Sequence, residues 1–162
     1  MIKKIGRDKK DESNRKLSRK YPRAEVWAHP DEFPNLYDLT LRGVKQATSS
    51  WFEEYEKDKE SLPKVGEVSI MLDRMENPSR ALVMVTKEVL VRPFHQVTAE
   101  EAFLEGEGNR SLRDWQTIFG DYWRKTLPEE GLEFSESGLV VTEIFTVLED
   151  YLLDNEENGR SK

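Results

Sequence analysis

The chain has 162 residues, of which 36% are hydrophobic and 35% are charged, and its formal net charge is −7. This length suits one ordinary domain. No segment approaches the roughly 20 apolar residues that a membrane-spanning helix needs, so the sequence excludes a helical membrane protein. The chain contains no cysteine, which excludes disulfide scaffolds, cysteine nucleophiles and zinc knuckles. The first residues lack the apolar segment of a secretory signal, so we expect a cytoplasmic setting.

Basic residues are concentrated at the start of the chain. Residues 1–24 contain ten Lys or Arg and three Asp or Glu, a net charge of +7, whereas residues 25–162 carry −14. A basic arm on an acidic body is typical of proteins in which Lys and Arg contact nucleic-acid phosphates. The alternatives are a solvated tail without a partner and a tail that folds back on the acidic body. We predict a flexible arm over residues 1–24.

The first half of the remaining chain shows one helical pattern and several strand patterns. Residues 33–43 place apolar side chains on one broad face and end at Gly43, which predicts a helix. Residues 44–60 predict a strand followed by a short helix. Residues 68–72 predict a second strand, and residues 80–94 form the longest β-like stretch of the chain.

The second half predicts two helices and a final strand. A helix over residues 98–108 begins with Thr98 as N-cap, followed three residues later by the Glu of a capping box. A longer helix over residues 110–127 begins with Ser111 as N-cap, and its apolar residues recur at helical spacing. The stretch after residue 139 predicts a strand through about residue 147.

The order of these elements indicates the fold class. A helix, several strands, two helices and a final strand favour an α+β fold over a regular βαβ array. We assign the folded domain to residues 25–152 and a polar tail to residues 153–162.

Two short segments carry the residues that can support chemistry. In residues 43–48, Lys45 and Thr48 stand three residues apart, directly after the predicted helix stop. In residues 105–112, two glycines bracket a carboxylate at the start of a helix. Glycines allow a backbone to approach a ligand closely, and a helix start offers free N–H groups to an anion. Local physics alone favours the alternative of a plain loop between two capped helices.

Taken together and in this order, the two segments resemble the ASCH domain family, whose fold is related to the PUA RNA-binding barrel. GVKQAT at residues 43–48 matches the family motif G-x-K-x-x-T, and residues 105–115 match EGEG-x-RSL-x-x-W. Further matches lie in LPKVG, PF-x-x-V-T and VVTEIFTV, so the similarity covers about residues 26–148. The resemblance implies a PUA-like β-barrel with surrounding helices packed around one cleft.

Two departures from the family pattern lie near that cleft. Relatives often have Asp where this chain has Asn109, and many have His where it has Phe119. Both losses weaken the case for metal-assisted cleavage. The two histidines, His29 and His95, are far apart in sequence, and neither has other metal-ligand residues at the spacing of a metal-binding motif. We predict neither a metal nor a cofactor.

The resemblance also implies roles for individual residues. Family members include an amidohydrolase that deacetylates N4-acetylcytidine, a metal-dependent ribonuclease and proteins assigned to RNA binding. The amidohydrolase pattern assigns catalytic roles to Lys45, Thr48 and Glu107, with Glu105 in reserve. A lysine in a partly dry cleft can act as base toward the Thr48 hydroxyl, and a carboxylate can handle the proton of the leaving group. The alternative is a salt bridge between Lys45 and Glu107 that only holds the barrel mouth together.

Several further residues surround these groups. The predicted binding residues are Gly43, Glu105, Gly106, Gly108, Asn109, Arg110 and Ser111. We predict a protein that binds RNA or a modified nucleoside, with amidohydrolase activity on N4-acetylcytidine-like substrates, and no membrane partner.

Two alternative functions stay open. One is a metal-dependent ribonuclease. The other is a non-catalytic RNA-binding module, in which Trp27, Trp51, Tyr55 and Arg110 stack on bases or contact phosphates. The acidic body argues against broad RNA binding and favours a small nucleoside-like ligand.

Overall fold

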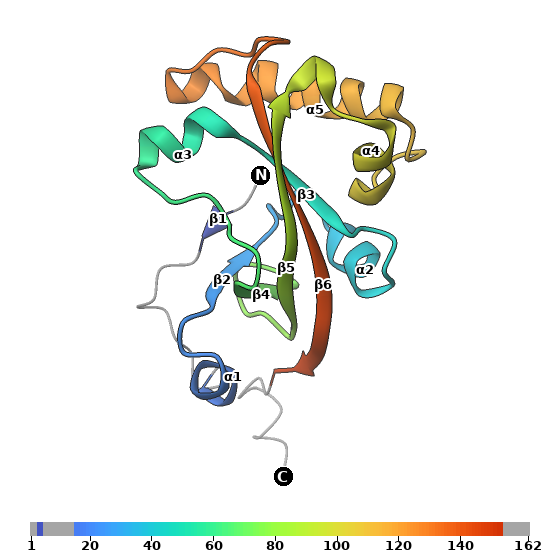
Figure 1. The fold of residues 1–162 in the computed structure, drawn as a ribbon. Helices are drawn as coiled ribbons and strands as arrows, with labels where there is room; N and C mark the ends of the chain where they lie inside the picture. Colours follow the sequence, from blue (N-terminus) through green and yellow to red (C-terminus); the bar gives the residue numbers. More distant parts are fainter. Residues whose placement is uncertain (1–2, 5–14, 154–162) are drawn as a thin grey trace.

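The computed structural model describes residues 3–4 and 15–153. In these residues the chain forms an α+β fold, as predicted, in which helices surround one mixed sheet of six strands (Figure 1). The strands are β1 (Lys3–Lys4), β2 (Glu25–Ala28), β3 (Ala47–Trp51), β4 (Val68–Leu72), β5 (Arg80–Pro93) and β6 (Leu139–Leu152). The helices are α1 (Arg15–Lys20), α2 (Leu36–Leu41), α3 (Phe52–Asp58), η2 (Phe94–Gln96), α4 (Ala99–Glu105), α5 (Leu112–Thr126) and η3 (Pro128–Glu130).

A long two-stranded ribbon organises the sheet. β5 pairs antiparallel with β6 from Arg80 opposite Leu152 to Pro93 opposite Leu139, with two shifts of register along the way. Such irregularities bend a strand and increase its twist. The strand order is β1-β2-β4-β5-β6-β3, so the sheet of the described residues ends at β1 and β3 and does not close on itself. The predicted closed barrel is therefore not confirmed.

Most of the predicted elements are confirmed. The capping box at the start of α4 forms as expected, because Thr98 and Glu101 exchange their side-chain to backbone hydrogen bonds. Ser111 accepts a hydrogen bond from the Asp114 N–H at the start of α5. Three differences concern strands: β6 continues to Leu152 instead of ending near residue 147, and the short strands β1 and β2 were not predicted.

Aromatic residues fill the core beneath α5, which lies across one end of the ribbon in Figure 1. Trp115, Phe119 and Trp123 recur every four residues along α5 and are buried together with Trp51 and Phe94. The rings of Trp115 and Phe119 stack with centroids 5.1 Å apart. Phe119, which replaces the histidine of many relatives, thus belongs to the apolar core.

The segment predicted as an arm contributes to the packed body. Within it, α1 buries Leu17 in a core cluster with Ala28 and Ile70. Residues 1–2 and 5–14 of the predicted arm, and the predicted tail from residue 154, lie outside the described residues. None of the helices in the described part of the chain is long and apolar enough to cross a membrane.

Candidate functional site

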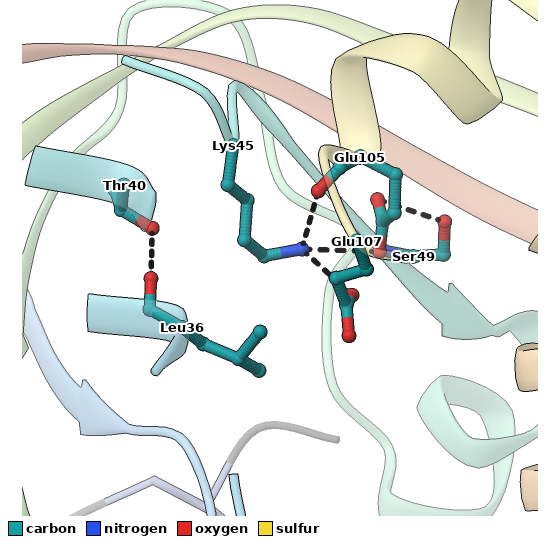
Figure 2. A network of polar contacts seen from close by, with 6 residues as sticks. All are labelled: Leu36, Thr40, Lys45, Ser49, Glu105 and Glu107. Carbon is teal, nitrogen blue, oxygen red and sulfur yellow. Dashed lines mark hydrogen bonds and ion pairs between the residues drawn. The ribbon is translucent and has the colours of Figure 1, made fainter. Parts of the chain in front are cut away.

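A buried lysine lies between two glutamates where the two predicted segments meet (Figure 2). Lys45 Nζ lies 3.2 Å from Glu105 Oε1 and 3.1 Å from Glu107 Oε2, and it also donates to the Glu105 backbone carbonyl at 3.2 Å. Ser49 donates to the Glu105 carboxylate twice, through its backbone N–H at 3.2 Å and its hydroxyl at 3.3 Å. We call Lys45, Ser49, Glu105 and Glu107 the Lys45 network.

The charged side chains of the Lys45 network differ in how far they are buried. The side chains of Lys45 and Glu105 are 1% and 2% exposed, whereas that of Glu107 is 11% exposed. A buried charge is stable only when it is paired and hydrogen-bonded. Glu107 is therefore the carboxylate of the network that lies nearest to solvent.

Backbone contacts bring the lysine to the end of α4. Gly43 adopts a positive φ of 73° after α2, and the N–H groups of Val44 and Lys45 both bond to the Leu39 carbonyl. The Gln46 N–H then bonds to a carbonyl in the last turn of α4 at 2.7 Å. These contacts fix the loop before β3 against α4.

Gly106 permits this close approach. It caps α4 with a φ of 75°, and a Cβ placed there would lie 2.5 Å from the Val44 carbonyl oxygen and 2.7 Å from Lys45 Cα. Contacts this short do not occur for a real Cβ, so a larger residue would force the two loops apart. The glycine that we predicted to approach a ligand thus approaches the lysine backbone.

One ammonium faces two carboxylates in this dry environment. Burial lowers the pKa of Lys45, but Glu105 and Glu107 raise it by more, so its net pKa lies above the ordinary value. Burial also raises the pKa of Glu105 to about 7, against the opposing effect of Lys45. Lys45 therefore keeps its proton at neutral pH, which argues against its predicted role as a base. Glu105 is the group that exchanges a proton near neutral pH.

Thr48 lies apart from the Lys45 network. Residues 48 and 49 are neighbours on β3, so their side chains point to opposite faces of the sheet, and Ser49 is the one that bonds to Glu105. The Thr48 side chain is buried and makes no hydrogen bond within the described ranges 3–4 and 15–153. The structure thus brings Lys45 and Glu107 together but does not bring Thr48 to them.

The other predicted binding residues shape the loop between α4 and α5. Arg110 donates to the carbonyls of Phe103 and Val44, and its guanidinium lies 3.6 Å from the Phe103 ring centroid. Asn109 accepts from the Ser111 N–H and donates its own N–H to Asp114. These hydrogen bonds occupy groups that we predicted to contact a ligand.

Gly108, Trp27 and Trp51 are also packed closely against other parts of the protein. Gly108 has a φ of 60°, and a Cβ there would collide with the Asp114 carboxylate. Trp27 and Trp51, which we considered for base stacking, are both buried in the core. Their rings are therefore not available to stack on a base at the surface.

Sequence reasoning missed two polar residues. Ser49 is the first; its position four residues after Lys45 was the available signal. Glu101 is the second: besides its capping role it is buried, lies 2.6 Å from Arg92 Nε and accepts a hydrogen bond from Thr142 at 2.8 Å. A capping glutamate that also pairs with a distant, half-exposed arginine has no local sequence signal.

The described cavities lie elsewhere. One of about 410 Å³ lies beside α2 and another of about 360 Å³ lies along α5, and neither is lined by Lys45, Thr48 or Glu107. Among residues 3–4 and 15–153, no group of three or more His, Asp or Glu side chains is placed to hold a metal ion. The Lys45 network is thus a largely buried ion-pair cluster outside these two cavities, and Glu107 is its most exposed charged side chain.

Comparisons with known proteins agree on the fold. A family model described as ASCH domain matches residues 25–149. The structure is similar to the ASCH domain from Lactobacillus crispatus JV V101, with a TM-score of 0.70 and 27% identity over 88% of this chain and 98% of that one. It is also similar to protein EF3133 from Enterococcus faecalis V583, with a TM-score of 0.62 and 26% identity over 79% and 72% of the two chains. No curated protein matches the chain.

Proposed function

Because the chain belongs to the ASCH domain family, which is often associated with RNA binding, we propose that it binds a modified nucleoside and hydrolyses an acyl amide on it at the Lys45 network. The observation that carries this proposal is the Glu105 carboxylate held 3.2 Å from the buried Lys45 ammonium, in surroundings whose burial raises the pKa of Glu105 to about 7. A general acid–base group works best when its pKa lies near the working pH.

Glu105 and Lys45 carry out the chemistry in this proposal. The ionised Glu105 carboxylate takes a proton from water, and the water oxygen forms a bond to the acyl carbon. The Lys45 ammonium stabilises the negative charge that develops on the carbonyl oxygen. Glu105 then passes the proton to the amine nitrogen as the C–N bond breaks, which releases the free amine and the carboxylic acid.

Glu107 controls access in the same proposal. It is the most exposed charged member of the network and bonds to Lys45 Nζ at 3.1 Å. A substrate that enters from this side displaces the Glu107 carboxylate from the ammonium and places its own carbonyl oxygen there. Thr48, which the family pattern assigns to catalysis, has no task in this arrangement.

Turnover of N4-acetylcytidine tests the proposal. The full chain is incubated with the nucleoside at pH 7, and cytidine release is followed by chromatography. We expect turnover by the parent protein, a loss of at least about 100-fold in Glu105→Gln, and little change in Lys20→Met, a surface lysine outside the network. Absence of turnover by the parent protein, or full activity in Glu105→Gln, would overturn the proposal. Thr48→Val separates this mechanism from one that uses the threonine hydroxyl.

Non-catalytic binding of RNA or a nucleoside is the second candidate function. The buried position of the network and the separation of Thr48 favour it. It predicts saturable binding of RNA without turnover and with a strong dependence on salt. Comparing the salt dependence of the full chain with that of a chain lacking residues 1–14 tests the predicted basic arm. Cleavage of RNA that depends on added divalent metal would instead support the ribonuclease prediction.

A further inference from the structure

A second candidate site lies at the other end of α2 from the Lys45 network. β2 and β4 are parallel and end side by side, with Ala28 paired to Leu72. The cavity of about 410 Å³ opens beyond these ends and beside α2. Its volume falls within the range of about 300–1,000 Å³ that is typical of small-molecule sites.

Ring side chains line this cavity. Phe33, Pro34 and Tyr37 line it together with Pro30. The aromatic rings offer planar apolar surfaces, on which a planar ligand stacks with little loss of side-chain freedom, and the proline rings add apolar contact area. This lining therefore favours a flat ring over a branched or flexible ligand.

Tyr37, which lines the cavity, also carries an unsatisfied polar group. The residue is only 6% exposed because its ring packs in the core with Trp27 and Met71. Its hydroxyl oxygen is buried and makes no hydrogen bond to the part of the chain that the structure describes. Buried hydroxyls normally find a partner, so a ligand atom that bonds to Tyr37 would satisfy this group.

Arginine side chains lie beside the tyrosine. The Arg80 guanidinium carbon lies 5.3 Å from the Tyr37 ring centroid, and an Arg80 nitrogen lies 3.7 Å from Asp38. Arg74 lines the same cavity. A guanidinium offers several donors in one plane, which suits the edge of a heterocycle.

The charges around the cavity exclude a polyanion as the preferred ligand. Two arginines are opposed by three aspartates, Asp31, Asp38 and Asp73, so the lining has no excess of positive charge. Asp73 accepts from the Ser79 N–H and hydroxyl, and Asp38 forms an ion pair with Arg80, so the lining carries both hydrogen-bond donors and acceptors. Such a mixture of donors and acceptors recognises a polar ring with few charges of its own.

We propose that this cavity binds a planar, weakly charged heterocycle of nucleobase size, stacked on the Phe33–Pro34 wall and hydrogen-bonded to Tyr37 and Arg80. The proposal goes beyond the hydrolytic function, since none of the Lys45 network residues lines the cavity. It gives the chain a ligand site that operates whether or not the network is catalytic.

Calorimetric titration of the full chain with adenosine, guanosine, cytidine and uridine tests the proposal, with ribose as the non-planar control. We expect at least one nucleoside to bind saturably and ribose not to bind. Tyr37→Phe keeps the ring and removes the hydroxyl, and Arg80→Gln removes the guanidinium. Each should weaken binding at least about fivefold, the size expected for one lost hydrogen bond. Arg124→Gln, at the second cavity, should leave affinity within about twofold.

The outcomes separate this inference from the proposed function. Failure of all four nucleosides to bind overturns it. Binding that survives Tyr37→Phe and Arg80→Gln but is lost in Glu107→Gln also overturns it, and places the ligand at the Lys45 network instead. Circular dichroism of each variant shows that a loss of binding is not a loss of folding. Turnover of N4-acetylcytidine with unchanged KM in Arg80→Gln would leave the hydrolytic proposal standing in either case.

Discussion

The Lys20–Glu149 pair and the Lys45 network both join a lysine to a glutamate, and they respond to their surroundings in opposite ways. At the surface, Lys20 Nζ lies 2.6 Å from Glu149, whose carboxylate also accepts hydrogen bonds from two tyrosine hydroxyls. The hydrogen bond from Lys20 is the main cause that lowers the pKa of Glu149 to about 2. In the Lys45 network, burial raises the pKa of Glu105 to about 7.

The difference shows that the pairing of charges alone does not decide protonation. Glu149 is partly open to water, so its charged form keeps its hydration and gains the hydrogen bonds. Glu105 is dry and shares one ammonium with Glu107, so its charged form is penalised. Of these two carboxylates, Glu105 has the pKa near neutral pH, and the following predictions test this contrast.

The largest effect is expected from Lys45→Met. Removing the ammonium leaves the buried Glu105 carboxylate without a cation, which we expect to lower the free energy of unfolding by about 3–5 kcal/mol. Urea denaturation at pH 7 measures the change. The double variant Lys45→Met/Glu105→Gln should recover a large part of the loss, because it also removes the buried acid. An equally large loss in Lys20→Met would show that burial is not what distinguishes the two clusters.

A backbone substitution at Gly106 should have the next largest effect. Gly106→Ala strains a positive φ and also forces a Cβ into the Val44 carbonyl, so we expect a loss of about 3 kcal/mol in the free energy of unfolding. Gly131 is the matched control, since it has the same φ of 75° but no atom within 4 Å of its added Cβ. Gly131→Ala should cost only about 1 kcal/mol. Equal losses would show that the contact between the two loops is not tight.

The pH dependence of stability should differ between the parent and Glu105→Gln. The pKa of Glu105 rises from 4.5 to about 7 on folding, so the folded state binds the extra proton between these values. Stability from this group is therefore greatest below about pH 4.5 and falls as the pH rises to 7, by on the order of 2 kcal/mol between pH 5 and 7. Denaturation curves of both proteins over this range isolate the contribution. Parallel curves would contradict the raised pKa.

The smallest effect on stability is expected at the surface cluster. The pKa of Glu149 is lowered on folding, so its contribution is present above pH 4.5 and is lost as the pH falls toward 2, the opposite direction to Glu105. Because solvent and salt screen an exposed pair, Lys20→Met should change the free energy of unfolding only slightly. An NMR titration of the Glu149 carboxyl should show its pKa moving toward the ordinary value in Lys20→Met. An unchanged pKa would exclude Lys20 as its main cause.

The sequence predicted the fold better than it predicted the site. Capping residues such as Thr98 and Ser111 act over three or four positions, so local chemistry determines where α4 and α5 begin. The contact between Lys45 and Glu107 was predicted from the family resemblance. It could not be predicted from local sequence, because the two residues are 62 positions apart. The strand β2 was missed because its four residues acquire their pairing only from β1 and β4.

Thr48 shows where the spacing argument failed. Lys45 and Thr48 stand three residues apart in the motif, but β3 begins at Ala47, and in a strand the side chains alternate between two faces. Ser49 therefore shares the network with Lys45, and Thr48 faces away from it. The protonation of Lys45 could not be predicted either, since it depends on how many carboxylates burial brings to one ammonium.

The residues of the Lys45 network come from two separate segments of the chain, and one of these segments is the connection between β5 and β6. The chain leaves the ribbon at Pro93 and rejoins it at Leu139, which is paired with Pro93. The connection that contains α4 and α5 therefore begins and ends at neighbouring positions of the sheet. Glu105 and Glu107 both lie in this connection, whereas Lys45 lies outside it, just before β3. A chimera that exchanges only this segment between homologues would replace Glu105 and Glu107 and leave Lys45 in place. The carboxylates of the network can therefore be exchanged independently of its lysine.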